Sequence, residues 1–227
     1  MAGIGTLHES GLHSGLKAWY ARPGDEAEVK LDGCVADLVR GDLVVEIQTH
    51  HFYAIKRKLL RLVETRPVRL VYPIALERWI VRVEADRQTV VGRRKSPRRG
   101  QAAHVFDELT SFPELIGHPN FSLEVLLTRE EEVRCPWSGP RRGRWKREWQ
   151  VCDRRLLEVA SSLVLASPAD CLALLPSGLP RPFSNSHLAR ALRQPPRLAA
   201  RMTYCLRRMG AIAELGKAGR ALIYDYA

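Results

Sequence analysis

The 227-residue chain lacks the sequence features that mark several large classes of protein. Its five cysteines are odd in number and form no C-x-x-C pair, which argues against a disulfide framework and against a zinc knuckle. No stretch approaches the roughly 20 apolar residues that cross a bilayer. The start, MAGIGTLHES, has no basic segment followed by an apolar run. We therefore expect a protein without membrane segments that resides in the reducing cytoplasm.

Catalytic motifs with a fixed glycine, serine or histidine pattern are also missing. The chain has no phosphate-cradling glycine loop, no nucleophile elbow and no H-E-x-x-H zinc motif. The hydrophobic content of 45% still predicts a globular protein with one substantial core or two small domains. Any catalytic site must therefore be sought among carboxylates and their neighbours.

Positive charge is abundant, and it is concentrated in the second part of the chain. Residues 1–84 carry 12 Lys and Arg against 11 Asp and Glu, whereas residues 85–227 carry 24 against 14. Two basic runs, which Gly and Pro interrupt and which we expect to be loops, dominate this part. They contain Arg93, Arg94, Lys95, Arg98 and Arg99, and then Arg141, Arg142 and Arg144. Such runs favour binding to DNA phosphates, although solvated basic loops without a partner are the alternative.

The segment DLVRGDLVVEIQ predicts a β-hairpin that brings two carboxylates together. Residues 35–39 and 43–47 are rich in branched apolar side chains, and Gly41-Asp42 suits a two-residue turn. This register places Asp37 opposite Glu46, with Cβ atoms roughly 5 Å apart, where like charges destabilise a sheet. A divalent cation would relieve that repulsion.

A metal site at this hairpin fits the ligands that the sequence offers. Mg²⁺ binds through one or two carboxylates plus water and phosphate oxygens, and Gln48 points to the same face as Glu46. An ordinary ion pair between Glu46 and an arginine is the alternative. Glu9 also has two interpretations, as the acidic member of a capping box begun by Thr6 or as a third carboxylate of the site.

The order of the predicted elements produces a resemblance to a known family. An amphipathic helix over residues 6–20, strands near 27–32 and in the hairpin, a helix over 51–64, and strands over 67–74 and 79–83 give an α/β core. With its early glutamate, its strand aspartate and an E-x-Q sequence, this core over residues 5–83 resembles the PD-(D/E)XK nuclease superfamily. The resemblance implies a restriction-endonuclease-like mixed sheet flanked by helices.

The same resemblance implies roles for individual residues. Asp37, Glu46 and Glu9 would bind Mg²⁺ or Mn²⁺, and Gln48 stands where the family usually has lysine. Glutamine can orient a water molecule but cannot transfer a proton as lysine can. Lys56 and Lys58 on the next helix are candidates for the missing cation, or ordinary solvated lysines.

The last 75 residues carry a separate pattern. Helices are predicted over 153–165, 169–175, 187–192 and 197–209, followed by strands over 211–215 and 221–226 that a basic turn joins. This order resembles a winged helix-turn-helix domain, which implies DNA contacts from the second helix and the wing. The residues implied are Arg197, Arg201, Tyr204 and Arg208 on the helix, and Lys217 and Arg220 on the wing. Winged helices also serve as protein-docking modules.

Together these patterns predict two domains and leave two functions open. Residues 1–150 form a nuclease-like domain, with its core at 5–83 and a basic extension at 85–150, and residues 151–227 form the winged helix. The first function is a metal-dependent DNA endonuclease, with a homodimer as one way to make paired cuts. The second is a catalytically inactive DNA-binding regulator on a nuclease-like scaffold.

Overall fold

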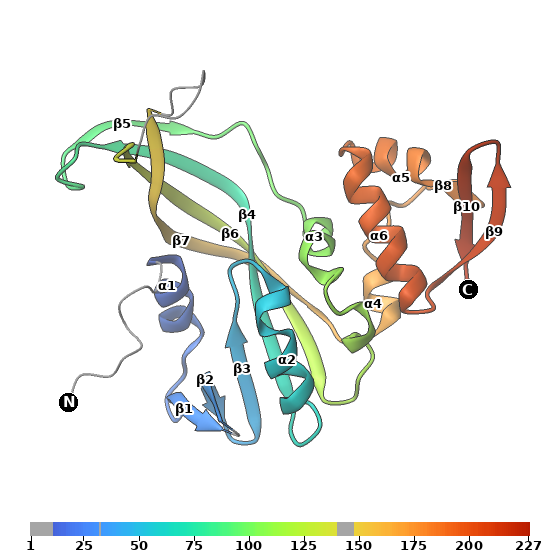
Figure 1. Ribbon diagram of the computed structural model, residues 1–227, viewed down its shortest axis with the longest axis horizontal. Helices are drawn as coiled ribbons and strands as arrows, with labels where there is room; N and C mark the ends of the chain where they lie inside the picture. The colour runs from blue at the N-terminus through green and yellow to red at the C-terminus, as the bar shows by residue number, and fades with distance from the viewer. Residues whose placement is uncertain (1–10, 32, 140–147) are drawn as a thin grey trace.

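A large mixed β-sheet organises most of the chain (Figure 1). The computed structural model describes residues 11–139 and 148–227, apart from residue 32. The elements up to residue 95 are α1 (Gly11–Tyr20), β1 (Glu26–Leu31), β2 (Cys34–Arg40), β3 (Leu43–Ile47), α2 (Phe52–Leu62), β4 (Val68–Val83) and β5 (Val90–Lys95). The next are the 3₁₀ helices η2 (Ala102–Val105) and η3 (Pro113–Leu115), helix α3 (Phe106–Leu109), and strands β6 (Phe121–Pro136) and β7 (Trp149–Leu165).

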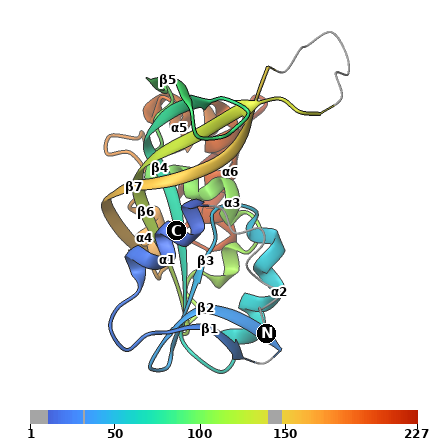
Figure 2. The same ribbon diagram turned by 90° about the vertical axis from the view of Figure 1, so that its left-hand side faces the viewer.

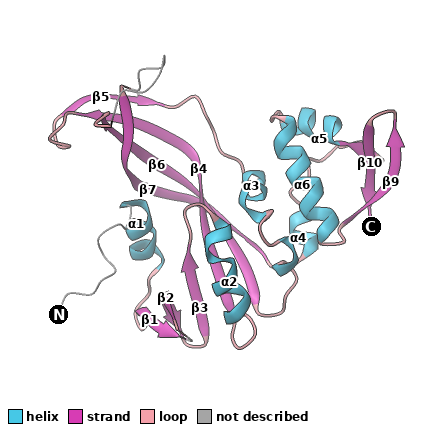
Figure 3. Cartoon of the chain, viewed as in Figure 1, coloured by secondary structure: helices cyan, strands magenta, loops and turns pink. Residues whose placement is uncertain are grey.

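The sheet combines antiparallel and parallel neighbours. Its strand order is β1-β2-β3-β4-β6-β7, and β5 pairs with β4. The first three strands form an antiparallel meander, and helix α2 then carries the chain to β4, which runs parallel to β3. β6 is parallel to β4, and β7 is antiparallel to β6. The predicted class, an α/β protein with a mixed sheet flanked by helices, is confirmed at this level (Figure 3).

The prediction of two strands between residues 67 and 83 was wrong. They form one 16-residue strand, β4, whose pairing with β6 is irregular between Ala75 and Glu77. Pro73 is tolerated inside this strand because the pairing with β3 ends at Val71, so no amide is needed on that side.

Helices α1 and α2 cover opposite sides of the meander (Figure 2). Side chains alternate along β3, so Val45 and Ile47 pack against Leu12 and Leu16 of α1, whereas Val44 joins the core beneath α2. Each buried aliphatic side chain contributes about 1.5–3 kcal/mol to folding. The hairpin strands are therefore fixed from both faces.

Two glycines allow α1 to lie close to β7. A Cβ atom on Gly11 would stand 2.9 Å from the carbonyl oxygen of Arg154, and one on Gly15 would stand 3.3 Å from Cβ of Leu156. The amide of Gly11 donates to Asp153 Oδ1 at 3.0 Å, which satisfies one free N–H at the start of the helix. These glycines weaken helix propensity, and the close approach explains their presence.

The C-terminal part adds three helices and a small sheet. Its elements are α4 (Pro168–Leu172), β8 (Phe183–Ser184), α5 (Asn185–Leu192), α6 (Pro196–Arg208), β9 (Ile212–Ala218) and β10 (Ala221–Tyr226). The three strands are ordered β8-β10-β9. The Ser184 hydroxyl accepts from the amide of His187 at 3.3 Å and caps α5, as its Ser-Asn-Ser start predicts.

The C-terminal helices share a core with the large sheet. Leu198, Met202 and Leu206 of α6 belong to the same buried cluster as Phe52 of α2 and Leu123 of β6. Helix α3 lies between α6 and the sheet in Figure 1. This continuous apolar cluster fixes α6 relative to the sheet.

The helix predicted over residues 153–165 was wrong, because this segment belongs to β7. Its 17 residues pair with β6 through a register that includes Leu123↔Leu165 and Glu132↔Arg154. The strand also crosses the domain boundary expected between residues 150 and 151. The spacing of its leucines suits a helix, but pairing with a long neighbouring strand overrides that local preference.

Two further expectations concern membranes and disulfides. Among the described helices, none combines the length and the apolarity that a membrane crossing requires. The cysteines at positions 34, 135, 152, 171 and 205 all carry free thiols.

We predict that Gly11→Ala destabilises the fold, although alanine is the better helix former. The new methyl group must displace Asp153 or the backbone at Arg154, and such overpacking costs about 1–3 kcal/mol. Urea unfolding measures the change. Ser14→Ala, on the exposed side of the same helix, is the control and should not destabilise the protein. Equal stability of the two variants would contradict close packing between α1 and β7.

Candidate functional site

The predicted hairpin is present, but its ladder stops before the two carboxylates. Strands β2 and β3 pair as Arg40↔Leu43, Val39↔Val44 and Leu38↔Val45, which is the predicted register. The prediction that Asp37 directly opposes Glu46 as a further ladder pair was wrong. Instead, Asp37 Oδ2 accepts from the backbone amide of Ile47 at 2.7 Å. A side-chain carboxylate thus takes the place of a main-chain acceptor.

Asp37 is held on the α1 side of the hairpin. His13 Nε2 of α1 lies 3.5 Å from Asp37 Oδ2. Burial by itself would raise the pKa of Asp37, but the hydrogen bonds from His13 and from the Ile47 amide outweigh it and leave the pKa below its ordinary value. The aspartate is therefore ionised near neutral pH.

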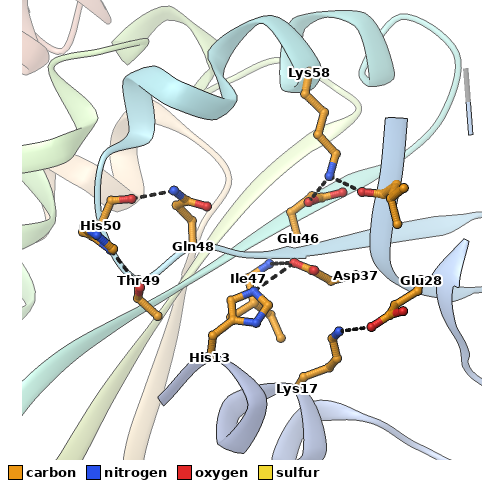
Figure 4. Close-up of polar contacts among 11 residues, drawn as sticks. His13, Lys17, Glu28, Asp37, Glu46, Ile47, Gln48, Thr49, His50 and Lys58 are labelled. Atoms are coloured by element: carbon orange, nitrogen blue, oxygen red, sulfur yellow. Dashed lines mark hydrogen bonds and ion pairs between the residues drawn. The ribbon is translucent and has the colours of Figure 1, made fainter. Parts of the chain in front are cut away.

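Glu46 points to the other side of β3, toward α2 (Figure 4). Its side chain is 5% exposed, and Lys58 Nζ lies 2.5 Å from Oε2. Burial raises the pKa of Glu46 to about 7; Lys58 opposes this rise, and Asp37 adds to it. The two carboxylates therefore turn to different helices, although the charge of Asp37 still acts on Glu46.

One oxygen of Glu46 has no hydrogen-bond donor. Oε1 is buried and unpartnered within the described part of the chain, whereas Oε2 is bound by Lys58. A buried acceptor without a donor costs about 1–3 kcal/mol. Lys58 Nζ also donates to the carbonyl of Val35 at 2.5 Å, so it is fixed between β2 and β3. The site thus retains one free acceptor in a place where water does not reach it.

Gln48 rises from the same side of β3 as Glu46, as predicted (Figure 4). Its Nε2 donates to the carbonyl of His50 at 2.5 Å, and Thr49 Oγ1 lies 2.9 Å from His50 Nδ1. His51, which precedes α2, has a left-handed φ of 60°. The amide of Gln48 is therefore engaged by the turn that starts α2 and does not contact Glu46.

The two lysines of α2 that the sequence offered as candidate cations have different partners. Lys56 Nζ donates to the carbonyl of Ser111 at 2.7 Å, away from the hairpin, while Lys58 reaches Glu46. Glu9 lies outside the described residues. The sequence prediction left His13 unassigned; its position beside buried Leu12 and one turn from Leu16 was the available signal that it faces the sheet.

Two carboxylates make up the ligand set that the described residues offer. No group of three His, Cys, Asp or Glu side chains in residues 11–139 and 148–227 is arranged to hold a metal. A divalent ion that binds through two carboxylates plus water and substrate oxygens does not need a third. In this arrangement Asp37 faces α1 and Glu46 faces α2, so a shared ion requires one of the two side chains to turn.

The first basic run is a strand followed by a loop, so the prediction of a loop was partly wrong. Residues 93–95 belong to β5, where Arg93 pairs with Glu131 at 2.9 Å and Lys95 with Glu77 at 2.7 Å. Both cations lie over the ring of Trp79. Arg94 lies on the opposite face of the strand, and Arg98 and Arg99 follow in the loop. Arg141, Arg142 and Arg144 lie outside the described residues.

The predicted DNA-contacting residues of the C-terminal part differ in exposure. Arg197 is exposed and Tyr204 is 45% exposed on α6, and Lys217 and Arg220 are exposed on either side of the turn between β9 and β10. Arg201, by contrast, forms an ion pair with Asp107 of α3. This pair, together with a 3.9 Å contact from Arg208 to Glu114, turns that side of α6 toward the body of the protein.

A cleft connects α6 with the end of β3. One cavity of 690 Å³ is lined by Arg197 and Arg201 of α6, and a second of 330 Å³ reaches Thr49, next to Gln48. The two cavities share Arg98, Arg99, His104 and Asp107. The cleft therefore runs from Thr49, just after β3, to α6 past two exposed arginines, and Asp37, Glu46 and Gln48 are not among its lining residues.

Comparisons with other proteins give a family but no described activity. A protein of Treponema pallidum (strain Nichols) named "Uncharacterized protein" is 31% identical over 223 residues, which cover 97% of this chain and 86% of the relative. No solved structure matches the chain. Residues 10–166 match the family model described as "Domain of unknown function (DUF8091)" and contain the hairpin, α1, α2 and the whole large sheet. The chain is a member of the DUF8091 family.

Proposed function

We propose that this protein is a metal-dependent nuclease that hydrolyses phosphodiester bonds in DNA. The observation that carries the proposal is the buried Glu46, whose Oε1 lacks a donor, on the same hairpin as the ionised Asp37. A carboxylate at this position is an expensive core residue, because burial raises its pKa to about 7. Such perturbed carboxylates gather at functional sites more often than in ordinary packing.

The topology around the site supports the same proposal. The order α1, three antiparallel strands, α2 and a parallel β4 is the order that the resemblance to PD-(D/E)XK nucleases implies. Asp37 and Glu46 stand on the second and third strands of that unit. Lys58, which reaches the glutamate from α2, provides the cation that Gln48 cannot.

The roles of the side chains follow from their contacts. Asp37 and Glu46 would hold Mg²⁺ or Mn²⁺, which supplies Lewis-acid stabilisation of charge and acidifies bound water. His13 and the Ile47 amide orient Asp37, and Lys58 anchors Glu46. Lys58 also places positive charge near a developing phosphoryl charge. Gln48 would orient water once its contact with His50 is released.

DNA is the substrate that the basic surface favours. We propose that α5, α6 and the β9–β10 hairpin act as a winged helix, with Arg197 and Tyr204 on the helix and Lys217 on the wing. The β8-β10-β9 sheet and the cleft that leads from α6 to Thr49 support this assignment. The free thiols agree with the cytoplasm as its proposed location. A homodimer for paired cuts stays part of the proposal.

The alternative is a nuclease-like DNA-binding regulator that does not cut. Its support is specific, since Asp37 and Glu46 each already have a side-chain nitrogen as partner, from His13 and Lys58. Gln48 also replaces the family's lysine. Supercoiled and branched DNA incubated with the protein and Mg²⁺ or Mn²⁺ separates the two functions, because only the first predicts cleavage that EDTA stops.

We predict that Glu46→Gln abolishes cleavage and removes the fall in stability that Glu46 causes in the wild type as the pH rises. Between pH 4.5 and 7 the unfolded chain releases the proton of Glu46 while the folded chain keeps it, so wild-type stability falls as the pH rises. Gln does not titrate, so the variant lacks this loss. The difference in free energy of unfolding between variant and wild type should therefore be up to about 3 kcal/mol larger at pH 8 than at pH 5. Urea unfolding in EDTA measures it.

The matched control for this prediction is Asp42→Asn in the exposed hairpin turn. It should leave cleavage and the pH dependence unchanged. Cleavage that survives Glu46→Gln and copurifies with the protein would remove Glu46 from the site.

We further predict that Arg197→Ala weakens binding to duplex DNA and lowers the salt slope by about 0.9, the value for one lost phosphate contact. Fluorescence polarisation in EDTA over a series of salt concentrations measures both quantities. Arg57→Ala, at an exposed position of α2 away from the cleft, is the control. An unchanged slope for Arg197→Ala would remove α6 from the DNA-binding surface.

A further inference from the structure

Arginines gather on one face of the distal half of the sheet, where β5, β4 and β6 lie side by side (Figure 1). Ile80 of β4 is paired with Arg94 of β5 on one side and with Glu132 of β6 on the other. Directly paired residues share a face, so Arg94 and Glu132 project on the same side. Arg78 and Arg134 are two residues along their strands and project there too.

Two buried glutamates hold this arginine cluster in place. Glu132 is 4% exposed; Arg78 Nη1 lies 3.2 Å from its Oε2, and Arg134 donates to its Oε1 at 2.8 and 2.6 Å. Glu130 is 2% exposed, accepts from Thr128 at 2.7 Å and lies 3.5 Å from Arg78 Nη2. Guanidinium groups fixed by carboxylates lose little entropy when a ligand binds.

One hydrogen-bond donor of Arg78 has no acceptor. Its Nε–H is buried and makes no hydrogen bond within the described part of the chain. An oxyanion would reach this donor after a shift of the Arg78 side chain, and arginine presents a fixed fork of donors that matches phosphate oxygens. The two glutamates cannot do this, as their contacts are to the other nitrogens of the group.

These residues surround a pocket of 310 Å³. Four arginines line it, and Glu132 is the one carboxylate among its lining residues, so the pocket carries a net charge of +3. The arginines are Arg78, Arg94, Arg98 and Arg134. No carboxylate pairs with Arg94 or Arg98 in the residues that the structure describes, so two of the four guanidiniums are available to an anion.

The pocket continues into the cleft beside the candidate site. It shares Arg78, Ser96 and Arg98 with the 330 Å³ cavity that reaches Thr49. Its volume is that of a small-molecule pocket, with room for a phosphate and its sugar but not for a double helix. The helix α6 lies at the other end of the cleft, beyond Arg99.

We propose that this arginine pocket binds a backbone phosphate of an unpaired strand, and that the substrate is duplex DNA with a single-stranded arm. The inference rests on the proposed function, because the arm would run from the end of the cleft at Thr49, the residue after Gln48. The duplex would lie against α6, and the arm would follow the cleft to Arg78 and Arg94. The enzyme would thus recognise a junction between paired and unpaired DNA.

Two neighbouring arginines of β5 give a matched test. Arg94→Ala removes an unpaired guanidinium of the pocket, whereas Arg93→Ala removes one on the opposite face that pairs with Glu131 and lies 5.2 Å from the ring of Trp79. Fluorescence polarisation of the full chain in EDTA would use three labelled probes: a blunt duplex, the same duplex with a 12-nucleotide 3′ or 5′ arm, and that arm alone.

We predict that Arg94→Ala lowers affinity for the arm and for the armed duplex by roughly tenfold, the effect of losing one charge-assisted hydrogen bond. Its salt slope on the single strand should fall by about 0.7. Affinity for the blunt duplex should stay unchanged, and Arg93→Ala should match the wild type on all three probes.

The possible failures are distinguishable. Equal losses for Arg94→Ala and Arg93→Ala, or an equal loss on blunt duplex and arm, would overturn the pocket while leaving the proposed nuclease intact. If Arg94→Ala weakens binding of the arm but the wild type does not bind the blunt duplex, the result supports the pocket and contradicts duplex binding by α6. A wild type that binds none of the probes would overturn both.

Discussion

Two carboxylates from one hairpin, each restrained by a side-chain nitrogen from a different helix, are the constraint on which the rest of this site depends. Glu46 is removed from water between β3 and α2, and it is kept there by Lys58. Asp37 is turned toward α1, where His13 and a backbone amide stabilise its charge. A branched apolar residue at position 46 would pack at lower free-energy cost. The free-energy cost of burying Glu46 is therefore explained if the carboxylate takes part in binding or catalysis.

The structural consequences of that arrangement extend to both helices. α1 must approach β7 closely to present His13, and Gly11 and Gly15 allow this approach. α2 must dock with Lys58 over β3, and its buried Leu59 fixes the rotation of the helix that makes this possible. The site is thus assembled by the packing on both faces of the sheet, although its two carboxylates come from one short hairpin.

Local signals were sufficient to predict the hairpin, its turn and the α/β class, because the pattern of branched residues and Gly41-Asp42 act over a few positions. Residues 153–165 could not be predicted in this way. Their leucine spacing suits a helix, and only the 16-residue β6 beside them makes a strand the better choice. Residues 93–95 likewise become a strand through pairing with β4 across a short connection.

The candidate site could also be predicted only as far as local signals reach. Asp37, Glu46 and Gln48 lie within 12 consecutive residues, so strand alternation places them near one another. The choice between Lys56 and Lys58 depended on how α2 docks, which its own sequence does not determine. The opposition of Asp37 to Glu46 failed because the aspartate carboxylate replaces a main-chain acceptor at Ile47, an exchange that a register count does not include.

The arginine pocket shares lining residues with the cleft that extends from Thr49 to α6. The central claim is that Asp37 and Glu46 together form a divalent-cation site. Titration of the metal-free protein with Mn²⁺, followed through the electron paramagnetic resonance signal of the free ion, tests it most directly. The account predicts one site per chain that Asp37→Asn removes and Asp42→Asn keeps. Equal Mn²⁺ binding by wild type and Asp37→Asn, or none by the wild type, would contradict it.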